Sequence, residues 1–506
     1  MAEVDERELI ARVDEILHRR PAVGLAVGVV QDGAMVFFRG HGLADVAANI
    51  PVTADTVFRV GSITKTFTAV AVMQLLERGL VDLDAPANDY LRGYELIPRA
   101  GWPSATVRHL LTHTAGIPEV VPRSGVFRPF FGESVRVGSR VPSLPERYRG
   151  GLRLVAEPGT RFRYTDHGPA TLGQIVEDVS GQPFGHYLRE HVFEPLGMTD
   201  TTLARTEVER SRLATGYTLG SRGARPVIER EVVTGGAGAA YSTPRDMGLY
   251  LAALLGGGGN DHGSVLEPAT IATMFQAHYQ PDPRVPGIGL AFFRADAGGH
   301  SVVEHQGILP GFDSQFFVAP DDGIGVMGFT NGARRGVLWL PTELGVMLNS
   351  LIGVPDDVIR TDLPQSPEIW SDICGWYYLP GPLTDVRARG MVGAGVEVFV
   401  RRGRLHLRAM TPVPALYRGL PLHPADDKDP YMFRIDLSEF GLGALRVVFS
   451  REPEGGTTAV HLDVMPLSAL KRPTVTNPRP WVEGALAVAA TAVAVRSRRA
   501  WGRQHR

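Results

Sequence analysis

The sequence predicts an α+β protein, in which helices cover an antiparallel sheet and a small all-β barrel follows. Two observations carry this prediction. Helical and strand-like segments alternate up to about residue 357, with helices early and late and strands between them. Beyond residue 366 apolar residues recur with a period of two in short segments, which is typical of a small barrel or sandwich.

The first part opens with a predicted hairpin, in which Ala22 to Val30 and Met35 to Phe38 flank a turn at Asp32 and Gly33. A helix is expected from Ile63 to Arg78, because the pattern closes at Gly79, a residue typical of helix C-termini. The remaining elements follow in chain order. They are helices over Gly173 to Ser180 and Arg245 to Leu255, and strands over Ile288 to Phe293, Phe316 to Ala319 and Ile324 to Thr330.

Two segments in which apolar residues recur with no clear period interrupt this order of helices and strands. Ile117 to Leu152 is rich in proline, glycine, arginine and aromatic residues, and its aromatics favour an ordered rim. Pro355 to Pro367 contains three prolines and acidic residues, as linkers do. We therefore expect a first domain over residues 1–357, a linker over 358–365, a barrel domain over 366–480 and a basic tail over 481–506.

The barrel prediction depends on five short segments with alternating apolar residues and on a hairpin signal at Arg402 and Gly403. Its expected strands are Val396 to Val400, Leu405 to Met410, Tyr431 to Ile435, Leu445 to Phe449 and Val460 to Val464.

Composition excludes several classes of protein. With 506 residues, 44% of them hydrophobic and 21% charged, the chain is expected to fold. A net charge of −2 provides no basic field for nucleic acid, so none is expected as a partner. The single cysteine, Cys374, excludes an intramolecular disulfide and a cysteine zinc cluster. No metal or organic cofactor is implied.

The two ends of the chain indicate where in the cell the protein is expected. Met1 to Glu6 is acidic and begins a helix, unlike a secretory signal, so we expect a cytoplasmic protein. Gly484 to Val495 is apolar but short of the roughly 20 residues that span a bilayer. We favour a terminal helix packed on the protein. Weak membrane-surface contact through an interfacial helix and the basic tail is the alternative.

Lysine is rare, and this directs attention to one site. The 52 basic residues comprise 49 arginines and three lysines: Lys65, Lys428 and Lys471. Ser62 and Lys65 form an S-x-x-K motif at the start of the predicted helix, where residues three apart share one face. A lysine amine can take the serine proton, which a guanidinium cannot do because it stays protonated. This explains a lysine in an arginine-dominated chain.

The S-x-x-K motif alone is weak evidence for a catalytic pair. Ser468 and Lys471 form a second S-x-x-K in the β-rich part, which we interpret as chance, and Ser62 on its own is typical of a helix cap. Two further motifs strengthen the hypothesis. Tyr164 and Asp166 form the one Y-x-[N/D] motif, and His305 and Gly307 form the one H-x-G motif before the Phe316 strand. A phenol beside a lysine can relay protons, and a strand glycine lets substrate approach closely.

In this order the three motifs resemble those of the serine β-lactamase and penicillin-binding-protein superfamily, specifically its class C-like branch. The resemblance covers roughly residues 15–350, and the tail is similar to the lipocalin-like barrel that follows such domains in some members. The supporting flanking segments are Thr106 to Ile117, Glu157 to Gly159, Phe162 to Tyr164, Phe193 to Met198 and Gly235 to Asp246.

The resemblance implies roles. Ser62 would be the nucleophile, Lys65 its base partner and Tyr164 a second acid or base. His305 and Gly307 would orient the substrate, with His305 where many relatives carry a lysine. The backbone N–H groups of Ser62 and Ile308 would form the oxyanion hole. One position departs, because Asp166 stands where the family usually has Asn. An extra carboxylate beside Lys65 favours the ammonium form of the lysine, and this favours Tyr164 over Lys65 as the base.

The expected activity is acyl transfer through a Ser62 acyl-enzyme, resolved by water, on a small-molecule or peptide substrate. We favour an esterase or a peptidase-like serine hydrolase, with weak β-lactam reactivity as a side reaction. A D,D-carboxypeptidase or β-lactamase and a peptide-cyclising acyltransferase are the alternatives within the superfamily. A catalytically silent binding protein is the alternative of another class; it would have lost Ser62, Lys65 or Tyr164, and all three are present.

Overall fold

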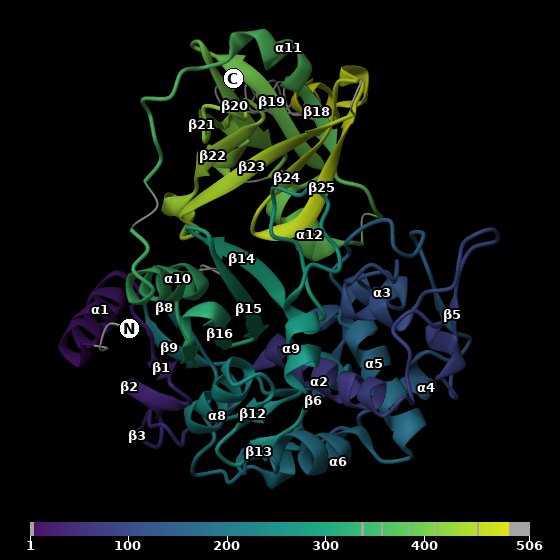
Figure 1. Ribbon diagram of the computed structural model, residues 1–506, viewed down its shortest axis with the longest axis vertical. Helices are drawn as coiled ribbons and strands as arrows, with labels where there is room; N and C mark the ends of the chain where they lie inside the picture. Colours follow the sequence, from purple (N-terminus) through teal and green to yellow (C-terminus); the bar gives the residue numbers. More distant parts are fainter. Residues whose placement is uncertain are drawn as a thin grey trace, which may run out of the picture.

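A computed structural model describes residues 5–334, 339–355, 358–382, 384–411, 413–452 and 455–484. It contains a seven-stranded antiparallel sheet with helices around it, followed by a closed eight-stranded antiparallel barrel (Figure 1). The predicted fold class is therefore confirmed. Most of the basic tail, from residue 485 onward, lies outside the described residues.

The large sheet has the strand order β14-β15-β16-β17-β1-β2-β3. Its strands are β1 (Gly24–Gln31), β2 (Ala34–Asp45), β3 (Ile50–Pro51), β14 (Phe293–Ala297), β15 (His300–Leu309), β16 (Phe312–Ala319) and β17 (Ile324–Thr330). The predicted hairpin is β1 and β2. Asp32 and Gly33 both have the positive φ that a two-residue turn of this kind needs.

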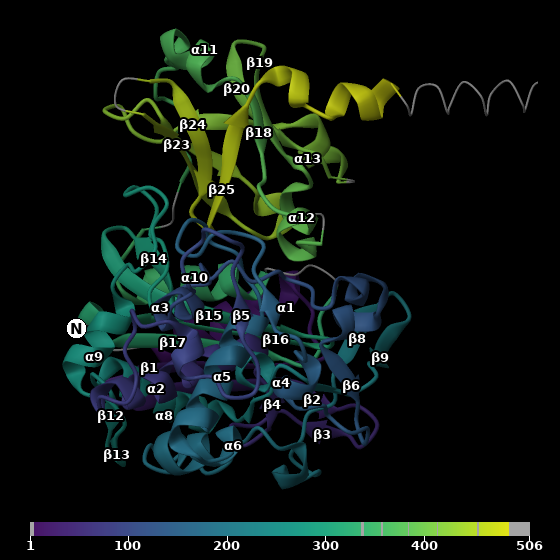
Figure 2. The same ribbon diagram turned by 90° about the vertical axis from the view of Figure 1, so that its right-hand side faces the viewer.

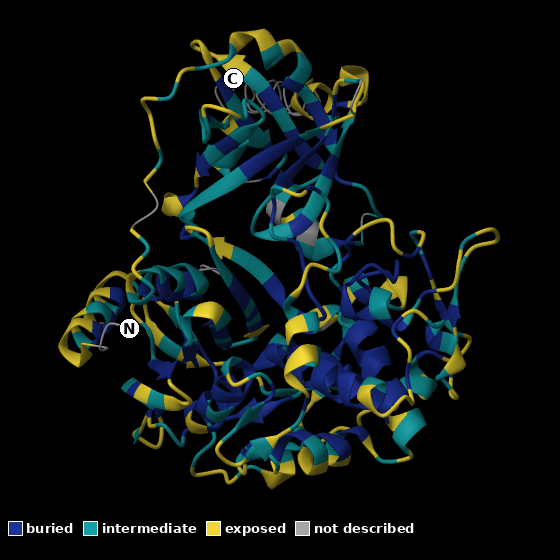
Figure 3. Ribbon diagram, in the orientation of Figure 1, coloured by how far each residue is buried: buried dark blue, intermediate teal, exposed yellow. Residues whose placement is uncertain are grey.

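The central strand β1 is buried on both faces because its apolar residues alternate between two cores. Leu25, Val27 and Val29 pack with α1 (Glu6–Arg19) and α10 (Trp339–Leu351). Ala26 and Val30 belong to the core on the opposite face. On that face α8 (Pro244–Leu255) packs directly on β1, β2 and β17. The helices α2 (Thr64–Glu77) and α5 (His167–Ser180) pack on each other and belong to the same core, and Figure 3 shows them almost entirely buried.

Smaller elements complete this domain. The helices are α3 (Val107–Leu111), α4 (Leu144–Arg147), α6 (Phe184–Leu188), α7 (Gly235–Gly238) and α9 (Pro268–Phe275). The short strands are β4 (Phe58–Arg59), β5 (Leu96–Ile97), β6 (Ser134–Arg136), β7 (Leu152–Arg153), β8 (Tyr217–Gly220), β9 (Gly223–Pro226), β10 (Arg230–Val232), β11 (Tyr241–Ser242), β12 (Gly259–Asn260) and β13 (Gly263–Ser264).

The strand predicted over Ile288 to Phe293 is wrong, since the ladder begins only at Phe293. Ile288 takes part in isolated bridges alone, and Ala291 has a left-handed φ of 64° that breaks an extended chain. Ile288, Leu290 and Phe292 are nevertheless fully buried. Their apolar pattern reflects a loop that fills the core rather than a strand. The predicted helix at Gly173 also begins earlier, at His167.

The barrel closes because its first strand pairs with its last. Each of the five predicted strands is present, and three more complete the barrel: β18, β21 and β25. The barrel strands are β18 (Gly375–Tyr378), β19 (Gly395–Arg401), β20 (Arg404–Ala409), β21 (Leu420–Pro424), β22 (Met432–Asp436), β23 (Ala444–Arg451), β24 (Thr457–Leu462) and β25 (Met465–Arg472). A closed barrel of this kind agrees with the expected lipocalin-like domain.

One short helix of the barrel domain reaches the first domain. The helices α11 (Trp370–Ile373) and α13 (Pro414–Arg418) flank the barrel, whereas α12 (Val386–Val392) lies at the barrel end that faces the first domain (Figure 1 and Figure 2). Asp385, just before α12, forms a buried 2.6 Å ion pair with Arg163 of the first domain. The domain boundaries at residues 357 and 366 stay predictions.

Within the described residues, none of the helices has the length and apolar character needed to cross a bilayer.

Candidate active site

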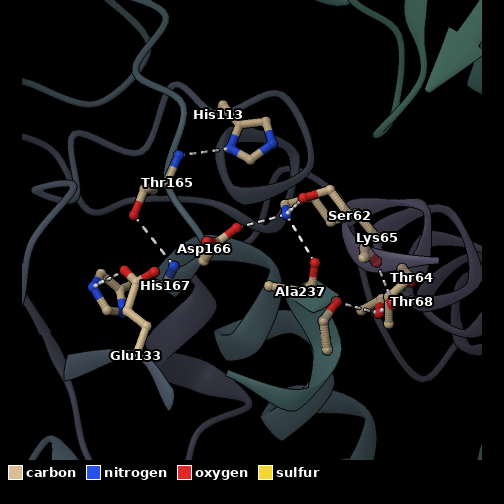
Figure 4. Close-up of polar contacts among 12 residues, drawn as sticks. Ser62, Thr64, Lys65, Thr68, His113, Glu133, Thr165, Asp166, His167 and Ala237 are labelled. Atoms are coloured by element: carbon tan, nitrogen blue, oxygen red, sulfur yellow. Dashed lines mark hydrogen bonds and ion pairs between the residues drawn. The ribbon is translucent and has the colours of Figure 1, made fainter. Parts of the chain in front are cut away.

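Ser62 and Lys65 lie together at the start of a buried helix. The short turn η1 (Gly61–Ile63) leads directly into α2, and the Thr64 hydroxyl supports this entry by donating to the Gly61 carbonyl at 2.6 Å. Because residues three apart share a helix face, Lys65 reaches back to Ser62, and its Nζ lies 2.9 Å from Ser62 Oγ (Figure 4). The structure therefore brings the predicted pair into hydrogen-bond contact.

The Lys65 ammonium uses all three of its donors. It donates to Ser62 Oγ, to Asp166 Oδ1 at 2.6 Å and to the backbone carbonyl of Ala237 in α7 at 2.9 Å. Burial alone would lower the pKa of Lys65, but the Asp166 carboxylate and the neighbouring Tyr164 raise it above its ordinary value. The resting structure thus holds Lys65 as a cation.

Asp166 lies in the site and does not cap a turn. It stands at the N-terminal boundary of α5, where its side chain makes no capping hydrogen bond. Its two oxygens bridge two cations instead: Oδ1 accepts from Lys65, and Oδ2 accepts from Arg387 of α12 at 2.6 Å. Burial would raise the pKa of this carboxyl, but Arg387 and Lys65 hold it far below its ordinary value. Asp166 is therefore ionised.

Arg387 is a residue of the site that the sequence analysis missed. Its side chain also lies 3.1 Å from Glu133, and its backbone N–H donates to Glu119 at 3.0 Å. Burial raises the pKa of Glu133 to about 8 and that of Glu119 to about 7. The sequence signal was indirect, because the unusual Asp166 calls for a compensating cation but nothing local selects it among 49 arginines.

Tyr164 is brought to Lys65 from the segment before α5. The Lys65 Nζ lies 5.0 Å from the centre of the Tyr164 ring, and the Arg387 guanidinium lies 5.8 Å from it. The ring packs against His113 at 4.5 Å between centroids and against Phe293 at 6.2 Å. Tyr164 therefore shares its surroundings with both cations of the site.

His305 is a buried neutral histidine on β15. Its Nδ1 lies 2.7 Å from the Gln306 carbonyl, which can only accept, so Nδ1 carries the proton. Burial and the charge of Lys65 lower the pKa of His305 to about 3. Its Nε2 is buried and has no hydrogen-bond partner among the described residues. An orienting role for His305 stays a prediction, and a permanent charge there is excluded.

Gly307 and Ile308 bring β15 against the Ser62 turn. A side chain on Gly307 would place its Cβ 1.9 Å from the Val60 carbonyl oxygen and 2.6 Å from Ser314 Oγ. Gly61 also lies close to β15: a Cβ built on it would lie 3.0 Å from the Ile308 backbone nitrogen. This approach sets the backbone of the two predicted oxyanion-hole residues, Ser62 and Ile308, side by side.

A cavity of about 160 Å³ opens beside Ser62. Its wall combines charged groups of the site with two aromatic residues of the segment expected to form a rim. The lining includes Ser62, Phe130, Phe131, Asp166, Ile308 and Arg387. His305, Gly307 and Tyr164 are not among the residues that line this cavity.

The second S-x-x-K motif does not form a pair. Ser468 lies on β25, where its hydroxyl contacts His461 at 3.0 Å, while the Lys471 ammonium donates to the Asp372 carbonyl. The described residues contain no cluster of His, Cys, Asp and Glu suited to a metal ion.

Comparison with known proteins identifies the family. A family model described as Beta-lactamase matches residues 9–339, more than half of the chain. The chain belongs to the beta-lactamase family. It is related to the penicillin-binding proteins and class C-like β-lactamases, so the resemblance drawn from its motifs is confirmed.

Members of this family similar to the chain include an esterase and a peptidase. Esterase EstB of Burkholderia gladioli is 31% identical over 372 residues, which cover 66% of this chain and 93% of EstB. The D-alanyl-D-alanine-carboxypeptidase/endopeptidase AmpH of Escherichia coli strain K12 is 30% identical over 234 residues, which cover 46% of this chain and 58% of AmpH. The match thus spans little more than half of AmpH.

The fold similarity extends over the barrel. The octameric penicillin-binding protein homologue from Pyrococcus abyssi superposes with a TM-score of 0.60 at 25% identity, covering 92% of this chain and 100% of that one.

Gly307→Ala is expected to slow acylation of Ser62 by about 10²–10³-fold, the effect of losing one oxyanion donor, because the new methyl group would push β15 off the Ser62 turn. The measurement is the rate of labelling by a fluorophosphonate. Gly220→Ala is the control, since a Cβ at Gly220 meets nothing within 4 Å. A normal rate in Gly307→Ala would contradict a role for this close approach.

Proposed function

We propose that the protein hydrolyses an ester or an amide through an acyl-enzyme on Ser62. The observation that carries this proposal is the 2.9 Å contact between Lys65 Nζ and Ser62 Oγ beside a cavity. A serine hydroxyl becomes a nucleophile when a neighbouring base takes its proton. The close approach of β15 to the Ser62 turn supports a role for the Ile308 N–H as an oxyanion donor.

The proposed reaction has two halves. In acylation, Ser62 Oγ attacks the substrate carbonyl carbon while its proton passes to the base, and the bond to the alcohol or amine then breaks as that leaving group takes the proton. In deacylation, water gives a proton to the same base and attacks the acyl carbon. Ser62 recovers its proton, and the free acid leaves.

Lys65 or Tyr164 serves as the base. Lys65 is in contact with Ser62, but as an ammonium ion it must first release a proton. Tyr164 faces the same ammonium and supplies a second group through which a proton can travel. His305 stays neutral and is proposed to orient the substrate together with Gly307.

An ester is the favoured substrate class. The similarity to EstB covers nearly all of that esterase and supports this choice. The aromatic residues Phe130 and Phe131 on the cavity wall suit an apolar acyl group. Peptide hydrolysis is the second candidate and is supported by the similarity to AmpH over a shorter region. β-Lactam reactivity is expected as a side reaction.

Product analysis tests this proposal. The protein is given a panel of acyl esters and D-amino-acid peptides in ¹⁸O-labelled water, with and without an amine acceptor. Hydrolysis places the label in the released acid, whereas an acyltransferase makes an unlabelled ester or amide with the acceptor. If no substrate is consumed and no acyl adduct appears on the protein, the catalytically silent alternative stands instead.

A further inference from the structure

A single carboxylate in the active site is shared between cations from two domains. Asp166 Oδ1 lies 2.6 Å from Lys65 Nζ of the first domain, and Asp166 Oδ2 lies 2.6 Å from the Arg387 guanidinium of the barrel domain. Asp166 and Arg387 are 221 residues apart in the chain. The barrel therefore contributes a charged group directly to the surroundings of Ser62.

The position of Arg387 is set by contacts at the N-terminal end of its helix. The Arg387 backbone N–H donates to both oxygens of Glu119, at 3.0 and 3.1 Å. Two residues earlier, Asp385 is paired with the buried Arg163. These contacts dock the first turn of α12 on the first domain, so the guanidinium has a fixed place beside Asp166.

The other titratable groups nearby do not replace this cation. Burial lowers the pKa values of His113 and His305 far enough to keep both rings neutral. Glu119 and Glu133 add negative charge when they ionise. Tyr164 faces both cations. Without Arg387, Lys65 would be the cation left in direct contact with Asp166 among the described residues.

We infer that Arg387 is a positioning residue of the active site: it holds Asp166 and offsets that carboxylate, so that Lys65 can release the proton that Ser62 chemistry requires. This inference rests on the proposed function and specifies what the barrel does in it. Asp166 and Arg387 act as a compensated pair, in which the arginine makes up for a carboxylate where the superfamily usually has Asn.

The two single variants should shift the pKa of Lys65 in opposite directions. Arg387→Gln leaves the Asp166 carboxylate to Lys65 alone and raises the lysine pKa, whereas Asp166→Asn removes the carboxylate and lowers it. A charge within about 4–6 Å of a titratable group moves its pKa by about one to three pH units. On the rising acid limb, each unit changes the fraction of neutral lysine, and hence the labelling rate, about tenfold.

The first experiment follows the rate of Ser62 labelling by a fluorophosphonate against pH. We expect the acid limb to move to higher pH in Arg387→Gln and to lower pH in Asp166→Asn. The double variant should return toward the unmodified protein. Arg389→Gln is the matched control, since Arg389 lies on the same helix but donates to the backbone carbonyls of Gly381 and Pro382.

The second experiment reads Lys65 without using activity. With only three lysines in the chain, ¹³Cε-lysine labelling produces three NMR signals, and the Lys65 signal is assigned by its loss in Lys65→Arg. In the Asp166→Asn background, where the lysine pKa is lowered, adding Arg387→Gln should raise it by about one pH unit or more. This background also serves if Arg387→Gln alone fails to fold.

The two readouts separate the two hypotheses. If Ser62 is not the nucleophile, labelling fails in every variant while the Lys65 titration still responds to Arg387. If Arg387 only docks the barrel, Arg387→Gln slows labelling without moving the acid limb. The double variant is then slower than either single one, and the Lys65 pKa is unchanged. That result would overturn the inference.

Discussion

Replacing Ser62 with alanine should abolish covalent labelling and reduce hydrolysis to the background rate. The hydroxyl is the group that would form the acyl-enzyme, and Ser62 lines the cavity, whereas the neighbouring Lys65 does not. Intact-mass analysis after fluorophosphonate treatment should show one adduct on the unmodified protein and none on Ser62→Ala. The expected effect is a complete loss of the adduct.

Ser468→Ala is the matched control because Ser468 belongs to the chain's other S-x-x-K motif but contacts His461 on the barrel wall. It should keep the adduct and the full rate. An adduct that persists in Ser62→Ala would place the nucleophile elsewhere and remove the basis of the proposed function.

Lys65→Arg should be nearly as damaging as Lys65→Ala, with a loss on the order of 10²–10⁴-fold in turnover. The substitution keeps the positive charge beside Asp166 but removes a group able to give up a proton, because a guanidinium stays protonated. Arginine must also fit where the Lys65 side chain is fully buried. The measurement is kcat and kcat/KM on the best ester of the panel.

Lys428→Arg provides the control for lysine replacement, since Lys428 is exposed on the barrel domain. Thermal unfolding of both variants separates loss of the base from loss of the fold. Substantial turnover in Lys65→Arg would mean that Lys65 only balances Asp166, and the search for the base would move to Tyr164.

Where two interacting residues lie close in the chain, the sequence alone was sufficient to predict their contact. Ser62 and Lys65 are three residues apart on one helix, so their contact follows from helix geometry. The alternating residues of the five predicted barrel strands were visible for a similar reason, because an inward-facing pattern of period two reflects local geometry. Two of the three strands that were missed lack that signal: β21 contains two prolines, and β18 has only four residues.

Tertiary structure decided what the local pattern could not. The apolar residues around Leu290 fill the core from a loop. Their apolar composition indicates burial, but burial does not determine whether the backbone pairs with another strand. The meaning of Asp166 depends on a residue 221 positions away. From the sequence it was an extra carboxylate beside a lysine; in the fold it is shared with Arg387. Electrostatic effects depend on distance in space, and the docking of α12, rather than any spacing along the chain, determines which of 49 arginines supplies that charge.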